Sequence, residues 1–407
     1  MKHFTLLIVI TILFSCNQNV QNNSDFNSSR GNIELMERDT IKTKILDFEN
    51  SLLVNYDSLV ADVHYILLDN KKGIIGQLDN ILYHNGLYCV YDKKEDCVYI
   101  YNEEGVCVNK IDEQGGGPTE YGAIANIDIN PINSEIVITD RFRPQIMFYG
   151  LDGNFKHKRL CPFQNSQAYL LNDTVIIHQM DPYQNVGVSE LEHYNLLAQV
   201  CDTIQYKSLL YYPSQTGYRG SNGLFKGYDN TLYYKPLFSD SIYIINSEKS
   251  YSLAYYAKFK NSVWQKHYKS KEFVHMDKEK GERLFRWLFD SKKYLVGYTD
   301  IVQDENERLN LMLYDKKTDK VFVSKFKEYE GLKEVNSIWG YDIVGVQDDY
   351  YISMLSSDFV IENLIEPMKS GKLLIKDKNL FAILNQIDED SNPLLILTRF
   401  KTPQIIE

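Results

Sequence analysis

Long apolar runs are almost absent from this sequence. The exception is residues 4–14, which are apolar apart from Thr5 and Thr11. A run this short is typical of the core of a signal peptide, because a transmembrane helix needs about 20 apolar residues. No other stretch is long and apolar enough to cross a membrane as a helix. The sequence therefore excludes a helical membrane-spanning protein and indicates export.

Positive charge is also scarce. The chain has 44 Lys and Arg against 55 Asp and Glu, so its formal net charge is −11 at pH 7. Binding to a phosphate backbone requires a basic surface. The charge balance therefore argues against a nucleic-acid partner.

Catalytic and metal-binding signatures are missing as well. The sequence has no H-E-x-x-H and no G-x-S-x-G motif, and its eight His show no metal-ligand spacing. Asp388, Asp390 and Asn392 alternate like the start of a calcium loop, but no glycine and distal glutamate complete it. We therefore predict no catalytic residue, no metal and no cofactor.

Cysteine is sparse, with five residues beyond Cys16. Five is an odd number, so at least one of them is unpaired or pairs with another chain. Cys89 and Cys107 lie within strand patterns, where a buried free thiol is the expected state.

The apolar run ends in Ser15-Cys16. This ending resembles the lipobox of bacterial lipoproteins, in which the cysteine is acylated and becomes the first residue; the alternative is an ordinary signal peptide with a chance cysteine. We assign residues 1–16 to the signal peptide and predict a membrane anchor at Cys16. Residues 17–58 begin with a polar stretch that cannot bury enough surface to fold, and we assign them to a tether and approach segment. They lack the run of acidic residues that resembles a surface-export signal in some bacterial lipoproteins. This absence favours the periplasmic face of the outer membrane over the cell surface.

A repeat of short strands follows. Two units lie 48 residues apart, and their matching residues are Asp92 and Asp140, Tyr101 and Tyr149, and Gly105 and Gly153. Weaker copies begin near residues 174, 231, 294 and 339, at the spacing of roughly 40–50 residues that is typical of propeller blades. A β-sandwich is the competing interpretation, but sandwiches seldom show a fixed period.

The repeat predicts an all-β fold, a six-bladed β-propeller over residues 59–402. The third unit includes a closing strand at residues 197–206. The sixth unit lacks one strand, and we expect residues 62–68 to complete it from the N-terminal side, because closure removes exposed sheet edges. A helical insert at about 261–291 is predicted from apolar residues at helical spacing, namely Phe273, Leu284, Phe285, Leu288 and Phe289.

Three motifs carry a family resemblance. Residues 115–121, GGGPTEY, resemble the G-x-G-P-G-E-Y/F loop of six-bladed β-propeller lipoproteins of Bacteroidetes, with Thr119 where glycine is usual. Residues 240–243 are similar to the S-D-x-I-Y element of that family, and residues 390–394 to its closing N-P-x-L strand. The family is related in shape to NHL-type propellers. Most members have no assigned activity, so the resemblance implies a fold more than a function.

Loop lengths indicate where a ligand would bind. In a blade with strands A to D running outward, the A–B and C–D turns lie on one face, here called the short-turn face. The B–C turns and the D–A connections lie on the other, here called the loop-rich face, because they include residues 112–122 and 356–393. Long loops on a rigid scaffold are where binding usually occurs.

The candidate binding residues all belong to the loop-rich face. Glu120 and Tyr121 follow the glycine-rich loop, and Arg141 and Arg143 form a pair that could grip a carboxylate or sulfate; the alternative is a solvated turn. Further candidates have side chains suited to binding a sugar or peptide, with loop packing as the alternative: Tyr183, Tyr211, Tyr212, Tyr218, Arg219 and Phe238.

We therefore predict a monomeric, non-catalytic propeller of the cell envelope that binds a glycan, a peptide or an envelope protein. One alternative is a metal-dependent propeller hydrolase, such as a lactonase, or a lyase with its metal in the central channel. A second is a structural accessory subunit of a nutrient-uptake complex, which a large exposed apolar patch would support.

Overall fold

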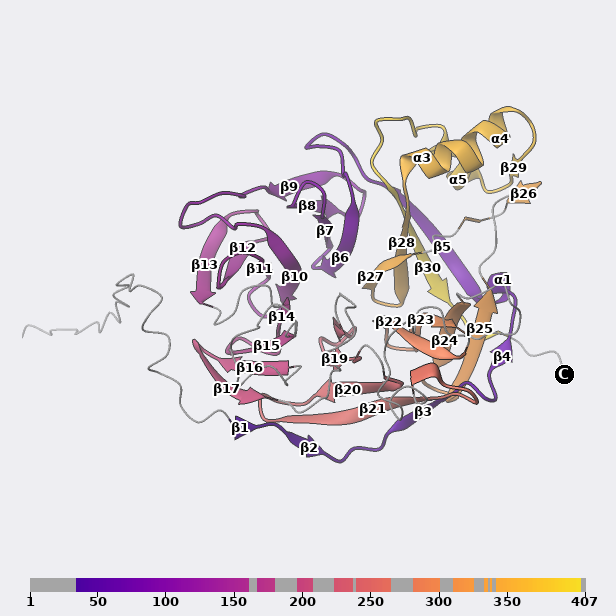
Figure 1. Ribbon diagram of the computed structural model, residues 1–407. Helices are drawn as coiled ribbons and strands as arrows, with labels where there is room; N and C mark the ends of the chain where they lie inside the picture. Colours follow the sequence, from indigo (N-terminus) through magenta and orange to yellow (C-terminus); the bar gives the residue numbers. More distant parts are fainter. Residues whose placement is uncertain are drawn as a thin grey trace, which may run out of the picture.

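Six sheets surround a central axis in the computed structural model (Figure 1). The structure describes residues 34–160, 167–179, 196–207, 223–236, 239–264, 281–300, 310–325, 333–335, 337–338 and 342–403. Each sheet contains a four-stranded antiparallel blade. The predicted six-bladed β-propeller is confirmed.

The blades follow one another in chain order. Blade 1 consists of β6 (Leu78–His84), β7 (Leu87–Asp92), β8 (Cys97–Asn102) and β9 (Cys107–Ile111). Blade 2 consists of β10 (Ile124–Asn130), β11 (Glu135–Asp140), β12 (Gln145–Gly150) and β13 (Phe155–Leu160). Blade 3 consists of β14 (Gln167–Leu170), β15 (Val175–Gln179), β16 (Leu196–Val200) and β17 (Thr203–Lys207).

The second half of the ring has the same order. Blade 4 consists of β18 (Leu224–Lys226), β19 (Leu232–Tyr234), β20 (Ser241–Ile245) and β21 (Ser250–Lys258). Blade 5 consists of β22 (Arg283–Asp290), β23 (Tyr294–Asp300), β24 (Asn310–Asp315) and β25 (Lys320–Lys325). Blade 6 consists of β27 (Ile343–Gln347), β28 (Tyr350–Leu355), β30 (Leu394–Phe400) and β5 (Val60–Leu67).

The repeated aspartate has the same role in blades 1 and 2. Asp92 accepts backbone N–H bonds from Gly76 at 2.7 Å and from Gln77 at 2.9 Å. Asp140 accepts from Gly122 at 2.8 Å and, in its own turn, from Phe142 at 2.9 Å. Each carboxylate therefore fixes the incoming D–A connection against the end of the second strand, which explains why the repeat retains it.

The ring closes as the sequence predicts. Strand β5 pairs antiparallel with β30, from Leu394 opposite Leu67 to Phe400 opposite Val60. Asn392, just before β30, is buried and accepts a bond from the backbone N–H of Ile75 at 2.7 Å. Its amide also donates to the carbonyl oxygen of Asp69 at 2.7 Å. The closing motif therefore ties the end of the chain to the segment that enters blade 1.

The segment before β5 wraps around the outside of three blades. Strand β1 (Glu34–Leu35) pairs parallel with β17, β2 (Glu37–Asp39) and β3 (Lys44–Asp47) with β21, and β4 (Leu52–Leu53) with β25 (Figure 1). We call residues 34–54 the belt. Helix α1 (Tyr56–Leu59) then leads into β5. The structure differs here from the expected tether, because Leu46 and Phe48 anchor the belt in the core between blades 4 and 5.

Six hydrophobic clusters make up the core, one between each pair of adjacent blades. Tyrosines fill much of it with their rings and place their hydroxyls near polar groups; Tyr121, for example, is fully buried and donates to the carbonyl oxygen of Asp96 at 2.9 Å. Cys89 and Cys107 are buried free thiols, as predicted. Cys161 lies outside the described residues.

The predicted helical insert is wrong over its last part, because residues 283–290 form strand β22. Leu284 and Leu288 pack toward blade 4, whereas Phe285 and Phe289 pack toward blade 6. A spacing of four residues returns a side chain to the same face in both a strand and a helix, so this pattern did not distinguish the two. Phe273 lies outside the described residues.

The third unit also differs from its expected form. Its predicted closing strand at residues 197–206 divides into β16 and β17, with Cys201 at a positive φ of 54° in the turn between them.

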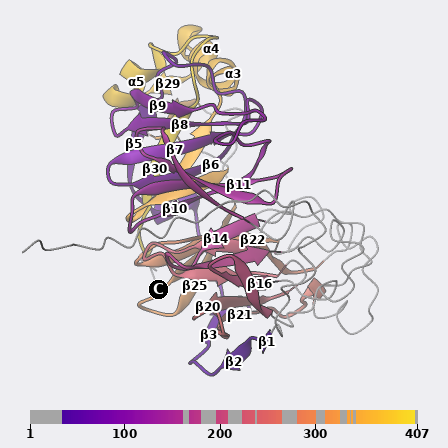
Figure 2. The same cartoon turned by 90° about the vertical axis from the view of Figure 1, so that its left-hand side faces the viewer.

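Helices occur instead in the connection between β28 and β30. Short helices α3 (Ser357–Val360), α4 (Glu366–Lys369) and α5 (Lys378–Leu384), with a π-helical turn at Ile361–Ile365, lie beside blade 6 (Figure 1 and Figure 2). The same region contains the short parallel pair β26 (Glu334–Val335) and β29 (Leu374–Ile375). Val360, Leu364 and Leu380 pack into the core between blades 5 and 6. Among the helices in the described ranges, none has the length and apolar character needed to cross a membrane.

Candidate functional site

A cavity of about 460 Å³ lies at one mouth of the central channel. Residues from the innermost strands of all six blades line it, among them Asn80, Asp128, Tyr169, Lys226, Asp290 and Val346. Residues of several A–B turns complete the rim, including Asn85, Asn230, Lys292 and Asp348. The cavity therefore opens on the short-turn face.

The inner strands come very close together at this mouth. A Cβ atom on Gly345 of β27 would lie 2.5 Å from the carbonyl oxygen of Ile81 on β6. Glycine is therefore required where blades 6 and 1 meet. A methyl group on Gly227, after β18, would likewise lie 2.7 Å from Asp290 Oδ2. These glycines let the inner strands of blades 6 and 1, and of blades 4 and 5, approach each other closely.

Two ion pairs, one between blades and one within a blade, stabilise the wall. Lys226 Nζ of blade 4 lies 2.8 Å from Asp128 Oδ2 of blade 2, and both side chains are largely buried. Within blade 5, Lys316 Nζ lies 2.6 Å from Asp290 Oδ1. Burial of a charge is tolerated only with such a partner, so these lysines have a structural role at the mouth.

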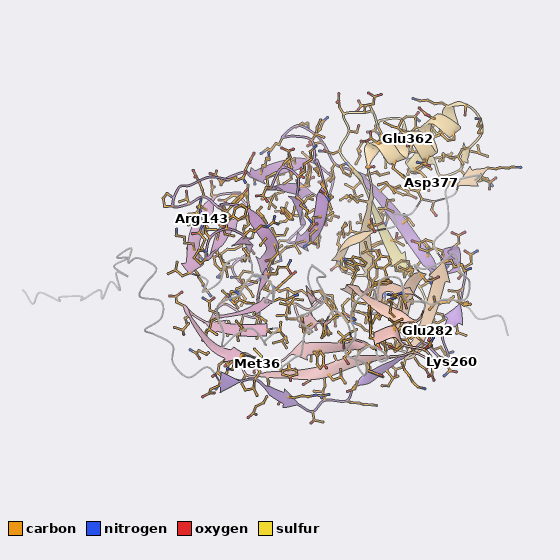
Figure 3. The ribbon with its side chains drawn as sticks, in the orientation of Figure 1. Met36, Arg143, Lys260, Glu282, Glu362 and Asp377 are labelled. Atoms are coloured by element: carbon orange, nitrogen blue, oxygen red, sulfur yellow. The ribbon has the colours of Figure 1, made fainter. Side chains whose placement is uncertain are left out.

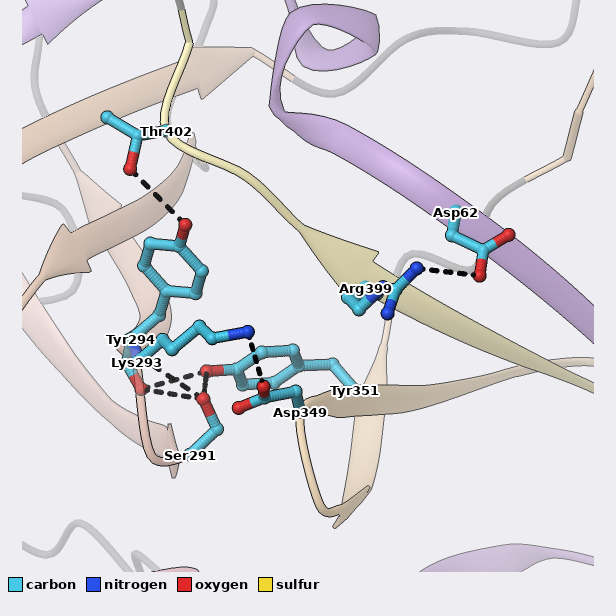
Figure 4. A network of polar contacts seen from close by, with 8 residues as sticks. All are labelled: Asp62, Ser291, Lys293, Tyr294, Asp349, Tyr351, Arg399 and Thr402. Atoms are coloured by element: carbon cyan, nitrogen blue, oxygen red, sulfur yellow. Dashed lines mark hydrogen bonds and ion pairs between the residues drawn. The ribbon is translucent and has the colours of Figure 1, made fainter.

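A polar network joins blades 5 and 6 beside the cavity (Figure 4). The hydroxyl of Tyr351 donates to the carbonyl oxygen of Tyr294 at 2.8 Å, and its oxygen lies 2.9 Å from Ser291 Oγ. Lys293 Nζ pairs with Asp349 Oδ2 at 2.7 Å across the same boundary. The network fixes the two A–B turns that carry Asp349 and Lys292 to the rim.

Two carboxylates of the wall have oxygen atoms without a hydrogen-bond donor among the described residues. These atoms are Asp290 Oδ2 and Asp349 Oδ1. Burial raises the pKa of Asp290 to about 6, although the ammonium group of Lys316 acts in the opposite direction. Unsatisfied buried acceptors are rare in native proteins and indicate strain, a functional role or an absent partner.

Aromatic and amide side chains supply the remaining polar surface. Tyr228 is 48% exposed at the rim, with Lys316 Nζ 5.2 Å from its ring centroid. Tyr83 donates to Glu103 Oε1 at 2.6 Å. His84 Nε2 lies 3.0 Å from Ser134 Oγ, and burial lowers the pKa of His84. The cavity thus combines donors, acceptors and ring faces.

Four of the sequence-predicted residues are described, and they form a local cluster in the second blade and its incoming loop. Arg143, whose side chain is labelled in Figure 3, donates to the carbonyl oxygens of Gly115 and Glu120, the latter at 2.9 Å. Arg141 donates to the carbonyl oxygen of Ile124 at 2.9 Å. Glu120 accepts from the backbone N–H of Gly117 at 2.6 Å.

This cluster includes the buried Tyr121 and belongs to B–C and D–A connections, so it lies on the face opposite the cavity. Binding by the cluster stays a prediction. Six other candidates lie outside the described residues, namely Tyr183, Tyr211, Tyr212, Tyr218, Arg219 and Phe238.

Sequence reasoning missed the channel mouth because most of the innermost strands were not recognised. Their residues carry no motif, and the polar residues that follow them, such as Asn85, Asn230 and Asp348, look like ordinary turn residues. Each of these three has a positive φ between 50° and 63°. The available signal was their recurrence after the first strand of three blades.

No group of three or more His, Cys, Asp or Glu in the described ranges is arranged to hold a metal ion. The residues around the channel mouth are suited to hydrogen bonding and stacking. Fold and site together define a six-bladed propeller with a polar cavity at the mouth of its channel. The family model described as "Domain of unknown function (DUF4934)" matches residues 40–399, and the chain belongs to this family.

Two solved structures from Bacteroides have a similar fold. One, named "Putative exported protein", is from Bacteroides fragilis; it is 18% identical, with a TM-score of 0.67 over 88% of this chain and 100% of that one. A member of the DUF4221 family from Bacteroides vulgatus is 12% identical, with a TM-score of 0.50 over 84% and 97%. Comparison with curated proteins finds no match. At these identities the likeness establishes the fold alone.

Proposed function

We propose that this protein is an exported, lipid-anchored propeller of the cell envelope that binds a small polar ligand, without catalysis, in the mouth of its channel. The observation that carries this proposal is the cavity of about 460 Å³ to which all six blades contribute. Its volume lies within the range of roughly 300–1,000 Å³ that is usual for ligand sites.

The wall of the cavity is suited to binding because it is rigid. Its strands belong to antiparallel ladders, the ion pair Lys226–Asp128 joins two strands of the wall, and Lys316 holds Asp290 of a third. A preformed site does not have to order loops when its ligand arrives, which favours affinity. Glu120 and Arg143 on the loop-rich face bond instead to nearby backbone.

Export and anchoring rest on the N-terminal sequence. Ser15-Cys16 follows the apolar run at the position of a lipobox, and the name of the Bacteroides fragilis relative also refers to export. Anchoring at the periplasmic face of the outer membrane is part of the proposal. The variant Cys16→Ala should leave the protein unprocessed or free of membranes, and flotation of this variant with lipid would contradict the anchor.

Ligand binding is tested by blocking the cavity. Asn80 is half-buried in its lining, so Asn80→Trp should fill the mouth, and Asn154→Trp in an exposed turn of blade 2 is the matched control. Each protein is incubated with a small-molecule extract of the envelope and examined by native mass spectrometry. Wild type and Asn154→Trp should retain the same bound mass, and Asn80→Trp should lose it at an unchanged melting temperature.

The same experiment distinguishes the two faces. Retention of the bound mass by Asn80→Trp, with its loss from a double variant of Arg141 and Arg143, would transfer the site to the loop-rich face. No bound mass on any of the proteins would contradict ligand binding altogether.

A further inference from the structure

The belt carries a concentration of exposed apolar side chains. Fourteen large apolar side chains are exposed in the described ranges, and four of them belong to the 21 residues of the belt. These four are exposed by between 43% and 53%, and they are Leu35, Ile41, Ile45 and Leu53. Single exposed apolar residues are ordinary on a protein surface, whereas several on one short segment indicate an interaction site.

Three of these side chains point away from the propeller. In β1, Leu35 precedes the buried Met36, which packs in the core between blades 3 and 4. In β3, Ile45 precedes Leu46, which is buried between blades 4 and 5. Successive side chains of a strand point to opposite sides, so Leu35 and Ile45 point into solvent. Ile41 lies in the exposed connection between β2 and β3. We call Leu35, Ile41 and Ile45 the apolar strip.

The apolar strip follows one part of the outer rim. Strands β1, β2 and β3 lie along the lower edge of the molecule in both Figure 1 and Figure 2. Figure 1 looks along the central axis, and Figure 2 shows the ring from the side. The strip therefore belongs to the rim of the ring and to neither of its two faces.

The segment that carries the strip has balanced charges. Residues 34–45 contain three acidic and three basic side chains, namely Glu34, Glu37 and Asp39, and Arg38, Lys42 and Lys44. The whole chain has a formal net charge of −11. An anionic lipid surface attracts segments with an excess of basic residues, which this segment does not have. The strip therefore fits a surface that is apolar beneath a layer without net charge.

The place of the strip in the sequence identifies that surface. Residues 17–33 connect Cys16, the proposed lipid anchor, to Glu34 at the start of the belt. Even fully extended they would span at most about 60 Å, so β1 is the described strand that the anchor restrains most tightly. A tethered contact is effectively intramolecular, so contacts too weak to recruit a free protein can orient an anchored one. Apolar side chains gain free energy when they move from water into the boundary of the acyl chains.

We propose that the anchored propeller rests on its rim, with Leu35, Ile41 and Ile45 inserted into the interface of a zwitterionic lipid bilayer. This inference rests on the proposed lipid anchor and goes beyond it, because it assigns the protein an orientation on the membrane. In this orientation the central axis runs parallel to the bilayer. The cavity and the loop-rich face then open sideways, and the membrane blocks neither of them.

The test places a Trp reporter on each side of the molecule. Ile41→Trp reports on the strip and Val108→Trp on the opposite rim, in blade 1. Ile132→Trp reports on the short-turn face and Phe142→Trp on the loop-rich face. All four replace an exposed apolar side chain, so they are matched. Each lipidated protein is reconstituted into phosphatidylcholine vesicles with plain or brominated acyl chains, and bromine quenches the fluorescence of a Trp that contacts it. Relative to wild type, only Ile41→Trp should lose additional fluorescence.

Removal of the other strip residues tests whether they hold the orientation. In the Ile41→Trp protein, Leu35→Ser combined with Ile45→Ser should remove most of the additional quenching. The matched change, Ile74→Ser combined with Ile132→Ser, should leave it intact. All of these proteins should float with the vesicles, because the anchor is unchanged. Quenching that survives the loss of Leu35 and Ile45 would overturn the inference.

The remaining results separate the orientation from the anchor. Quenching of Ile132→Trp or Phe142→Trp would place the protein face down, and equal quenching or none at all four positions would show that it has no preferred orientation. Each of these results overturns the inference and leaves the anchor intact. A wild-type protein that does not float with the vesicles would contradict the anchor and this inference together.

A second copy of the chain is the alternative occupant of the strip. In that case the mature chain, expressed without its lipid, would form dimers that Leu35→Ser combined with Ile45→Ser dissociates, as analytical ultracentrifugation would detect. Such dimers would overturn the assignment to the bilayer. We expect a monomer with and without the two changes.

Discussion

The outer edges of blades 3 to 5 and those of blades 1 and 2 are protected in different ways. Strands β17, β21 and β25 are each covered by a parallel strand of the belt. Strands β9 and β13 form the outer edges of their sheets in the part of the chain that the structure describes. An unpaired edge can pair with other chains, so both groups need protection.

The sequences of these edges explain the difference. Strand β25 buries Val321, Phe322 and Val323, and would expose an apolar edge without β4. Strand β13 instead carries four basic side chains in succession, from Lys156 to Arg159. Charged side chains on an edge disfavour pairing with other strands. The comparison of β25 with β13 teaches that the belt covers an apolar edge in blade 5, whereas basic side chains protect the uncovered edge of blade 2.

Removal of the belt should have the largest effect. Deleting residues 34–54 exposes three sheet edges and removes the buried side chains of Leu46 and Phe48. We expect a loss of at least about 5 kcal/mol, a large part of the total stability of a typical domain, together with aggregation. Size-exclusion chromatography and thermal melts measure it. A deleted protein that stays monomeric and melts like wild type would show that the belt is only a tether.

The loss of stability caused by a single substitution in the belt should depend on how deeply that residue is buried. Leu46 is fully buried between blades 4 and 5, and its neighbour Ile45 is 45% exposed. Leu46→Ala should cost about 2–5 kcal/mol in urea unfolding, because it leaves a cavity. Ile45→Ala, the matched control, should stay within about 0.5 kcal/mol of wild type. Equal effects of the two changes would mean that the belt does not anchor in the core.

The sequence predicted the repeated blades of this molecule better than the belt, whose strands pair with distant parts of the chain. Asp92 and Asp140 marked two blades because each performs the same local bonding, and a missing strand in the last blade predicted β5. The belt escaped notice because its strands span two to four residues, which is too short for a periodic pattern. Its pairing depends on partners about 170 to 270 residues away, which local sequence does not reveal.

The candidate site was predictable only in part. The sequence pointed to a polar surface on a propeller face, and loop length selected the loop-rich face. The cavity depends on six strands meeting at one axis, where Gly345 approaches Ile81 and Lys226 reaches Asp128. Neither contact leaves a local motif. The strand β22 shows the converse problem, since the spacing of Leu284 and Leu288 fits two kinds of structure.

The two groups of blades also differ in how their buried carboxylates are hydrogen-bonded. This difference should appear in the pH dependence of stability. Asp92 and Asp140 in blades 1 and 2 accept backbone N–H bonds, whereas Asp290 Oδ2 in blade 5 has no donor among the described residues. Burial raises the pKa of Asp290 from 3.8 to about 6 in the folded protein. The stability it contributes is therefore fully present below about pH 4 and is lost as the pH rises through about 6.

The variant Asp290→Asn should remove this dependence. Relative to wild type, the free energy of unfolding of the variant should rise by about 2 kcal/mol between pH 4.5 and pH 7.5. Urea unfolding at both pH values measures the difference, with Asp202→Asn as the exposed control. A difference between variant and wild type that does not change with pH would show that Asp290 is not destabilised by burial.

The smallest effect on stability is expected at the uncovered edge. Replacing Lys156 and Lys158 of β13 by Thr removes charges from side chains that make only exposed or partly buried contacts. The melting temperature should change by no more than a few degrees, since each such contact contributes roughly 0–1 kcal/mol. Self-association should increase, as analytical ultracentrifugation would detect. A variant as monomeric as wild type would show that charge does not protect this edge.

The most direct test of the proposed binding site compares the two faces with one ligand. The small molecule that wild type retains in the mass-spectrometric test is titrated calorimetrically into wild type, Tyr228→Ala, and a double Ala variant of Arg141 and Arg143. We predict a Kd weakened about tenfold or more by the change at Tyr228 and unchanged by the double change. Unchanged affinity at Tyr228 with lost affinity in the double variant would contradict binding at the channel mouth.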